Sequence, residues 1–338
     1  MKDNQNLKNI QVQRAKIIDL IREFFKKAGF LEVETPILVP YAGTEPYLDP
    51  IKINFRDDKG TNYSGYLITS PEYSLKKLLA LGFDKIFEIT KAFRQKEAFG
   101  GYHNIEFSLL EWYRLNSNYR QIMKDVENLI YFLAKKINKK SSVSYLGQKI
   151  DLTPPWRMIS VKEAFKIYSQ IDLEKVKKFN DFKKILISKN YSLNKENTWD
   201  DLFFLIFLNE IEPCLPKNQP VIIYDYPLPQ AALAKKKNPK SFYAERFEVY
   251  IGGLEIANAF SELTDYKEQE KRLKQEQKLR KKLKKEIIPI DKEFIFALKS
   301  GIPASAGIAL GIDRLQMLLL DIEDINDLLI FPAKQIFN

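Results

Sequence analysis

Two glutamates beside a glycine pair form the clearest candidate metal-binding pattern in this sequence. Gly252-Gly253 separates two stretches rich in strand-forming residues, which predicts a β-hairpin with a two-residue turn. In that hairpin Tyr250 lies opposite Glu255, and Glu248 points to the same face as Tyr250. Two carboxylates on one face repel each other unless a cation lies between them, and oxygen ligands favour Mg²⁺. A pair of exposed surface glutamates is the alternative that the hairpin alone leaves open.

A second group of candidate residues lies on two strand-like stretches between residues 86 and 113, which a glycine-rich loop joins. Such a pair is typical of antiparallel strands. Because side chains alternate between the two faces of a strand, Phe107, Glu111 and Tyr113 share one face. Arg94 stands at the end of the preceding strand. An arginine, an aromatic ring, a carboxylate and a phenol could therefore line one sheet face; a solvated face is the alternative.

The third group, residues 307–314, combines small residues with an arginine at the start of a predicted helix. Small residues let a ligand approach the backbone, and Asp313 favours a helix start. Arg314 in the first turn opposes the positive end of the helix dipole, which favours a role facing a bound anion. A salt bridge to a neighbouring acid is the alternative. The sequence has no phosphate-binding loop of the G-x-x-x-x-G-K-[S/T] or G-x-G-x-x-G type, so any ATP site uses other residues.

Composition narrows the possible classes of protein. The chain of 338 residues has a net charge of +10, which favours an acidic partner such as a nucleotide, a nucleic acid or an acidic protein. Cys214 and His103 are the only residues of their types, which excludes an internal disulfide and multi-histidine metal sites. The start of the sequence lacks a signal-peptide pattern, and no stretch reaches the roughly 18 apolar residues of a membrane span. These features predict a cytoplasmic protein.

The elements that must position these residues follow from hydrophobic periodicity. Helices are predicted at 10–27, 74–81, 120–136, across most of 161–211, and at 267–286 and 312–320. Strands are predicted at 30–34, 86–94, 106–113, 221–226, 246–257 and 307–310. Scattered strands without β-α-β alternation favour an α+β fold with an antiparallel sheet flanked by helices. The charged helix at 267–286 is interpreted as a solvated face, with docking of an acidic partner as the alternative.

Taken in order, these groups resemble the three motifs of class II aminoacyl-tRNA synthetases. Residues 29–36 resemble motif 1, which builds the family's dimer interface, and Gly307 to Arg314 resembles motif 3. Arg94 with the stretch from His103 to Phe107 resembles motif 2. The match to the lysine branch rests on residues 69–73, 110–114, 246–248 and 261–265.

Within that branch the chain resembles the elongation factor P (R)-β-lysine ligases, which are truncated lysyl-tRNA-synthetase-like proteins. The resemblance rests on the start directly at motif 1 and on Ala309, where lysyl-tRNA synthetases usually have glycine. It implies one catalytic domain over residues 1–338, a helical insertion at about 161–215, no anticodon-binding domain and a homodimer. It also implies activation of (R)-β-lysine by ATP as an acyl-adenylate and transfer to a lysine of elongation factor P, with tRNA not expected as a partner. An RNA-charging synthetase core and a non-catalytic lysine- or RNA-binding paralogue are the alternatives.

The resemblance also implies residue roles. Arg94 and Arg314 are the implied catalytic residues, and Mg²⁺ is implied on Glu248 and Glu255. The implied ATP site consists of Arg94, Gln95, Lys96, Glu97, His103, Asn104, Phe107, Glu255, Ile256, Gly311 and Arg314. The implied substrate site consists of Ser70, Pro71, Glu72, Glu111, Tyr113, Asn258, Glu262 and Ala309. In that site the side-chain ammonium is received by Glu111, Tyr113 and Glu262.

Two positions depart from the family pattern. Lys96 stands where a glutamate is usual, two residues after the motif 2 arginine, and Glu97 could take that role through a bulge. Ala259 stands where glycine is usual and narrows the space beside the backbone. Neither position belongs to the ammonium-binding group or to the arginines.

Overall fold

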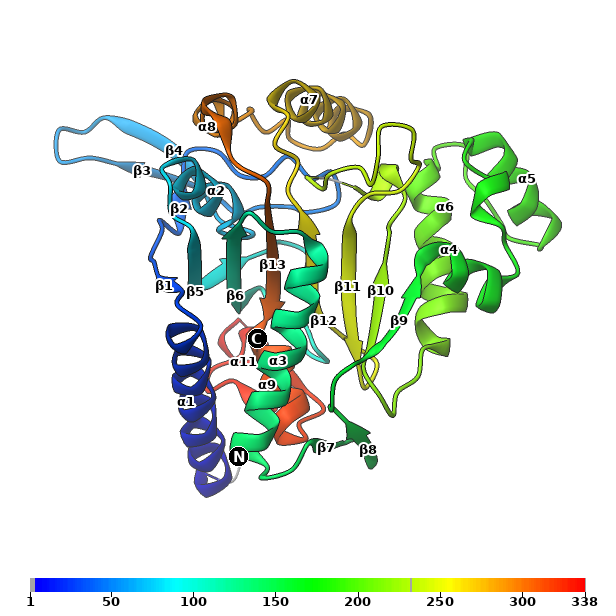
Figure 1. Cartoon of the computed structure of the whole chain (residues 1–338). Helices are drawn as coiled ribbons and strands as arrows, with labels where there is room; N and C mark the ends of the chain where they lie inside the picture. The colour runs from blue at the N-terminus through cyan, green and yellow to red at the C-terminus, as the bar shows by residue number, and fades with distance from the viewer. Residues whose placement is uncertain (1–3, 232, 338) are drawn as a thin grey trace.

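The computed structural model describes residues 4–231 and 233–337, and one eight-stranded sheet runs through it (Figure 1). Its strands, in spatial order, are β1 (Leu31–Glu32), β5 (Lys85–Phe93), β6 (Glu106–Leu115), β13 (Ser305–Gly311), β12 (Leu254–Ser261), β11 (Arg246–Ile251), β10 (Val221–Tyr224) and β9 (Arg157–Ser160). Neighbouring strands from β5 to β10 are antiparallel, and only the outer pairs β1–β5 and β9–β10 are parallel. The α+β prediction is confirmed.

One face of this sheet is covered by three helices, α1 (Asn4–Lys27), α3 (Tyr119–Ile137) and α9 (Ile312–Leu320). Phe25 of α1 stacks on Phe87 of β5 with ring centroids 4.8 Å apart and also contacts Trp112 of β6. Trp112 is fully buried, whereas Glu111 and Tyr113 on the same strand point to the other face. This period-two alternation leaves the opposite face of the sheet free to carry the polar residues.

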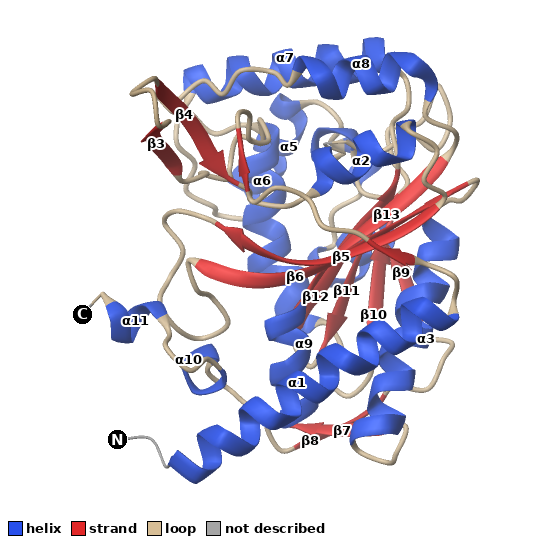
Figure 2. Cartoon of the chain, turned by 90° about the vertical axis from the view of Figure 1, so that its left-hand side faces the viewer, coloured by secondary structure: helices blue, strands red, loops and turns tan. Residues whose placement is uncertain are grey.

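The other face is closed at one end by α2 (Glu72–Ala80), α7 (Tyr266–Lys282) and α8 (Lys292–Gly301). Figure 2 shows α7 and α8 along the end of the molecule that lies opposite α1. Leu75 and Leu79 of α2 pack with Tyr113 and with Phe294 of α8, so α2 is held between the sheet and α8. The apolar packing leaves the first turn of α2 directed towards the open part of the sheet.

Smaller elements surround this arrangement. A three-stranded sheet of β2 (Leu38–Val39), β4 (Asn62–Leu67) and β3 (Lys52–Arg56) extends from one side (Figure 1). The hairpin of β7 (Ser142–Tyr145) and β8 (Gln148–Asp151) lies beside α9, and α10 (Ile325–Leu328) and α11 (Ala333–Ile336) complete the described C-terminal part. No helix of residues 4–231 and 233–337 is both long and apolar enough to cross a membrane.

Residues 161–214 are mostly helical and pack beyond β9 and β10 (Figure 1). Their helices are α4 (Val161–Ala164), α5 (Phe179–Ser188) and α6 (Trp199–Ile206), with π-helical turns at Phe165–Ser169 and Phe207–Ile211. A row of stacked rings, Phe165, Phe203 and Phe207, forms their core. The terminal residues 1–3 and 338 of the expected domain lie outside the described part.

Several predicted boundaries need correction. The first helix begins at Asn4 rather than at residue 10, because no glycine or proline interrupts the polar residues before its apolar stripe. The strand predicted at 30–34 has only two residues. The helix predicted to end at residue 286 ends at Lys282, and Lys284 has a left-handed backbone with φ of 55°.

Candidate active site

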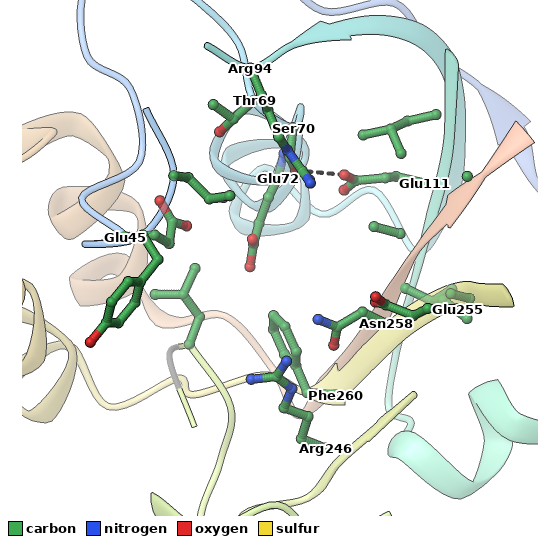
Figure 3. Close-up of a pocket in the computed structure, with 18 of the residues that line it drawn as sticks. Glu45, Thr69, Ser70, Glu72, Arg94, Glu111, Arg246, Glu255, Asn258 and Phe260 are labelled. Carbon is green, nitrogen blue, oxygen red and sulfur yellow. Dashed lines mark hydrogen bonds between the residues drawn. The ribbon is translucent and has the colours of Figure 1, made fainter. Parts of the chain in front are cut away.

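The open face of the sheet contains a cavity of about 620 Å³. Its floor is made by β6, β12 and β13, and its walls by the first turn of α2, the loop around Glu45 and one side of α7. In Figure 3, Arg94 lies at the top, Glu111 lies on the right with Glu255 and Asn258 below it, Glu45 lies on the left, and Glu72 points into the space between them. Members of all three polar groups found in the sequence, namely Arg94, Glu111, Glu255 and Arg314, therefore meet in this cavity, whereas Glu248 lies outside its lining.

One end of the cavity is built around Glu111, whose side chain is 1% exposed. Ser70 Oγ donates a hydrogen bond to Glu111 Oε1 at 2.5 Å, and Tyr113 Oη donates to Oε2 at 3.2 Å. Burial, together with the nearby charge of Glu72, raises the pKa of Glu111 to about 8. An incoming ammonium group would favour the ionised form of this carboxyl.

The neighbouring strand β13 gives this end its shape. Ala309 pairs with Glu111, and Gly307 pairs with Tyr113. A Cβ atom on Gly307 would lie 2.1 Å from a ring carbon of Tyr113, so only glycine leaves room for the phenol. On its other side Ala309 pairs with Asn258 of β12, which brings Ala309 between two predicted substrate-binding residues.

The third predicted ammonium ligand, Glu262, lies behind the cavity wall. Its side chain is 4% exposed, and its Oε2 forms an ion pair of 2.5 Å with Nζ of Lys76. Lys76 also contacts Glu72 Oε1 at 2.5 Å. Sequence reasoning missed Lys76, because the i, i+4 spacing from Glu72 is equally typical of an exposed helical ion pair. The structure buries this lysine between two carboxylates.

The opposite end of the cavity carries the two predicted arginines. The guanidinium of Arg94 lies over the ring of Phe107 at 4.9 Å, and burial lowers the pKa of Arg94. Arg314 Nη1 donates to the backbone oxygen of Glu255 at 2.9 Å, and its guanidinium lies 5.2 Å from the ring centre of Tyr102. Two guanidinium groups and a flat aromatic face together form a surface suited to phosphates and a base.

The backbone of the loop after Arg94 explains why Lys96 stands where the family usually has a glutamate. Lys96 has a left-handed backbone with φ of 61°, and its exposed side chain contacts Asp49 at 2.8 Å. Glu97 lines the cavity and its carboxylate lies 2.7 Å from Nδ1 of His103. Gln95 is tied to the carbonyl of Pro50 at 3.0 Å. Glu97 and His103 are thus brought into the cavity, whereas Gln95 and Lys96 lie outside it.

The other predicted site residues also divide into those that line the cavity and those that lie outside it. Ile256, Asn258, Ala309 and Gly311 line the cavity. Asn104 lines it as well, but its amide donates to the carbonyl of Glu106 at 2.7 Å and accepts from the backbone of Ala333 at 3.0 Å. Its side chain therefore braces the loop. Pro71 is the residue before α2 and lies outside the cavity lining.

The predicted metal-binding glutamates lie on adjacent strands. Tyr250 pairs with Glu255 across the hairpin, as the sequence predicted. The carboxylate of Glu248 accepts from Arg246 at 2.7 Å, from Tyr226 at 2.6 Å and from Tyr250 at 2.7 Å. Burial and the charge of Glu248 raise the pKa of Glu255 to about 7, which a bound cation would reverse. Within the described residues no group of three or more acidic, histidine or cysteine side chains could hold a metal ion.

Several cavity residues were given no role from the sequence, although Arg246 belongs to a stretch that resembles the lysine branch. Glu45, Asp200, Arg246 and Glu276 line the cavity from a loop, from α6, from β11 and from α7. Burial, with the nearby charge of Glu45, raises the pKa of Glu276 to about 8. These residues are separated by long stretches of chain, so only the packing of α6 and α7 onto the sheet brings them together.

An antiparallel sheet that presents these arginines and carboxylates beside helices on both faces is the catalytic-domain architecture of class II synthetases. The chain belongs to the family of class II tRNA synthetases for D, K and N, whose model matches residues 1–335.

Individual relatives are lysine–tRNA ligases. The chain is 35% identical over 336 residues to that of Clostridium perfringens (strain SM101 / Type A), and the match covers 98% of this chain and 65% of the relative. It is 37% identical to that of Clostridium novyi (strain NT), with 98% and 64% covered. It is 36% identical over 335 residues to that of Thermoanaerobacter sp. (strain X514), with 98% and 65% covered. The chain thus spans a little less than two thirds of the length of these relatives.

Proposed function

We propose that this protein activates a lysine-like amino acid with ATP, forming an acyl-adenylate, and transfers the acyl group to a lysine of elongation factor P. One observation carries the proposal. A single cavity has buried carboxyl groups at one end and two arginines at the other. The carboxyl groups suit the ammonium of the amino acid, and the arginines suit its carboxylate and the phosphates of ATP.

Activation needs positioning and charge stabilisation rather than a side-chain nucleophile. A carboxylate oxygen of the amino acid attacks the α-phosphorus of ATP, and the bond to pyrophosphate breaks. Arg94 holds the reacting carboxylate and the α-phosphate, and Arg314 holds the γ-phosphate. Phe107 stacks on adenine, while Glu97, His103 and Asn104 support the nucleotide site. Glu248 and Glu255 would hold Mg²⁺, which neutralises phosphate charge when it is bound.

Recognition of the amino acid rests on buried acceptors. Glu111 and Tyr113 receive the side-chain ammonium together with Glu262, and Ser70, Glu72 and Asn258 orient the other amino group and the carboxylate. Each charge-assisted hydrogen bond contributes on the order of 1.5–3 kcal/mol. A site of this kind rejects an analogue without the amine, because buried carboxyl groups would remain without a counter-charge.

The preferred substrate in this proposal is (R)-β-lysine, and the preferred acceptor is elongation factor P. Ala309 supports the choice of substrate, because it pairs with Asn258 on one side and with Glu111 on the other, at a position where lysyl-tRNA synthetases usually have glycine. The methyl group of alanine leaves less space for the α-carbon of the bound amino acid. This favours a substrate whose amino group is on the β-carbon rather than on the α-carbon. The acceptor follows from the resemblance to the elongation factor P ligases.

Two assays test the proposal. ATP–pyrophosphate exchange, run with α-lysine and (R)-β-lysine side by side, is expected to depend on the amino acid and to be faster with β-lysine. Incubation with ATP, β-lysine and elongation factor P is expected to increase the mass of the factor by one lysyl residue. Exchange without any mass gain, from either isomer, would reject the acceptor but keep the activation step.

Charging of tRNA is the second candidate function. The relatives are lysine–tRNA ligases, and the net charge of +10 suits a nucleic acid partner. The same enzyme preparation decides between the two acceptors. Lysylation of tRNA at a rate comparable with modification of the factor would favour the second candidate.

A further inference from the structure

Lys76 is a buried cation for which the proposed function has no role. It lies on α2, one turn after Glu72, and its side chain is 3% exposed. Its Nζ is 2.5 Å from Glu72 Oε1 and 2.5 Å from Glu262 Oε2. The rings of Phe260 and Phe294 lie on its other sides, 5.0 Å and 5.9 Å from Nζ to the ring centres. Burial of a lysine is costly unless it is paired, so the two carboxylates explain why the charge is tolerated.

The two partners of Lys76 are the carboxylates that serve the two amino groups of the substrate in the proposed function. We infer that Lys76 is a positioning residue for amine recognition, which holds Glu72 and Glu262 as their resident counter-charge so that only a substrate with two amino groups completes the pocket. This inference rests on the proposed function, since it concerns how the same cavity selects its amino acid.

The balance of charges in the pocket explains the requirement for two amino groups. Glu72, Glu111 and Glu262 contribute three negative charges when they are ionised, and Lys76 contributes one positive charge. Two further positive charges are needed, and a diamino acid supplies them with its side-chain and backbone amino groups. An amino acid with only one amino group leaves one buried carboxylate unmatched, and that group must keep a proton or remain as an unpaired charge.

Other titratable groups also face this site, and the cation among them, Arg272, pairs with Glu268 at 3.1 Å. Those that face it from the loop, α2, β6 and α7 are Glu45, Tyr73, Tyr113, Arg272 and Glu276. Burial raises the pKa values of the two phenols well above their usual range, so both are neutral. Burial also raises the pKa of Glu45, and it raises that of Glu276 to about 8.

Lys76 acts on the protonation of Glu262. Burial raises the pKa of Glu262 to about 8, and the charge of Lys76 works in the opposite direction. Burial also works against the charge of Lys76, but Glu262 and Glu72 outweigh it and raise the pKa of this lysine. Without Lys76, Glu262 would keep its proton to still higher pH, and a substrate ammonium would find it ionised less often. In a protein without Lys76, the affinity for lysine would therefore be low at neutral pH and would increase as the pH rises.

The test compares Lys76→Met with Lys77→Met, in the whole protein. Lys77 is the next residue of α2 and points away from the cavity to Asp291, at 2.6 Å. Lysine binding is measured by calorimetry at pH 7 and pH 9, and exchange kinetics give the KM values. Lys76→Met is expected to weaken lysine binding about tenfold or more at pH 7, with a smaller deficit at pH 9 and an unchanged KM for ATP. Lys77→Met is expected to match the wild type.

A double-mutant cycle with Glu262→Gln separates positioning from a merely structural role. If Lys76 acts through Glu262, Lys76→Met weakens lysine binding less in the Glu262→Gln background than in the wild type, and the remaining effect reports its contact with Glu72. The double variant also avoids an uncompensated carboxylate, so it remains informative if Lys76→Met alone does not fold. Additive effects, or a Lys76→Met deficit that is equal at both pH values, would overturn the role of Lys76.

Norleucine and 6-aminohexanoate test the two-amine requirement directly, because each lacks one of the two amino groups of lysine. Both are expected to bind the wild type at least about tenfold more weakly than lysine. Binding of either within twofold of lysine contradicts the charge count. A wild type that binds neither α-lysine nor β-lysine would reject the proposed function itself, whereas normal lysine binding by Lys76→Met would reject only the inference about Lys76.

Discussion

In the proposed function, Glu111 is the residue on which amine recognition depends most directly. It combines almost complete burial with hydrogen bonds from a serine and a tyrosine, and no cation of the described residues forms an ion pair with it. A carboxyl group in such a place is stable as the neutral acid until a cation arrives. The residue is therefore prepared for a substrate ammonium rather than for a structural ion pair.

Replacing Glu111 with Gln is expected to raise the KM for lysine by about two orders of magnitude, because a neutral amide cannot offset a buried ammonium. The KM for ATP should change little, since Arg94 and Arg314 lie at the other end of the cavity. Pyrophosphate exchange measures both constants. Glu106→Gln, on an exposed position of the same strand, is the matched control and should leave both constants unchanged. A Glu111→Gln enzyme with normal lysine KM would contradict the assignment.

The raised pKa values predict opposite pH trends for stability and for binding. The pKa values of Glu111, Glu262 and Glu276 are each about 8 in the folded protein, above the usual value for a glutamate. Between the usual glutamate pKa and about 8, the folded state therefore binds more protons than the unfolded state. The free energy of unfolding is highest at low pH and falls as the pH rises through this range to about 8. Ligand-free protein should melt at a lower temperature at pH 9 than at pH 6.

Lysine binding is expected to strengthen over the same range, because ionised carboxylates hold the ammonium, which itself stays charged up to about pH 10. Thermal melts with and without lysine at each pH measure both trends. A stabilisation by lysine that shrinks between pH 6 and pH 8 would show that these carboxyl groups do not receive the amine.

At the scale of elements, strand pairing decides what the cavity can hold. β13 places Gly307 beside Tyr113 and Ala309 beside Glu111, so two small residues leave space above two functional side chains. Arg280 fixes the position of α7. Its side chain is 2% exposed and donates to the carbonyls of Glu45, Leu48 and Glu286. The helix that was expected to be a solvated face is therefore anchored along one side.

Gly307→Ala is expected to displace the ring of Tyr113, since the added methyl would lie 2.1 Å from a ring carbon. Overpacking of this kind costs about 1–3 kcal/mol of unfolding free energy and should also raise the KM for lysine. Denaturant unfolding and exchange kinetics measure the two effects. An alanine variant with unchanged stability and unchanged KM would mean that β13 and β6 adopt another register.

Arg280→Met is expected to lower the unfolding free energy by about 3 kcal/mol or more, because three buried carbonyl groups lose their donor. Urea denaturation measures the change. Lys281→Met, at the exposed neighbouring position, should stay within about 0.5 kcal/mol of the wild type. Equal stabilities of the two variants would show that α7 is not held by this arginine.

On the scale of the whole molecule, α6 and α7 both contribute side chains to the lining of the cavity. The exposed side of α7 ends in a basic segment that includes Lys281, Lys282 and Lys284. Lys285 differs from these, because its ammonium contacts Asp49 at 3.1 Å. A surface of like charge beside the cavity favours approach of an acidic partner.

Charge reversal at Lys281, Lys282 and Lys284 is expected to slow modification of elongation factor P several-fold while pyrophosphate exchange stays unchanged. Lys285 is left in place so that its contact with Asp49 is preserved. Mass spectrometry of the factor over time measures the transfer rate. Unchanged rates of both transfer and exchange would show that this segment does not dock the factor.

The sequence by itself determined the local parts of this protein. Alternation along residues 106–113 fixed the shared face of Glu111 and Tyr113, and the glycine pair fixed the hairpin that sets Tyr250 opposite Glu255. These features depend on the period of a strand and on a short turn, and both can be deduced from neighbouring residues.

Tertiary structure alone decided which charges became buried and with which partners. Lys76 and Glu72 are one helical turn apart, but Glu262 reaches them from a distant strand end. Similarly, the backbone at Lys96 directs Glu97 inward, and α7 adds Glu276 to a wall shared with Glu45. Burial and pKa depend on the surroundings of a group in space, and the surroundings here come from elements far apart in the chain.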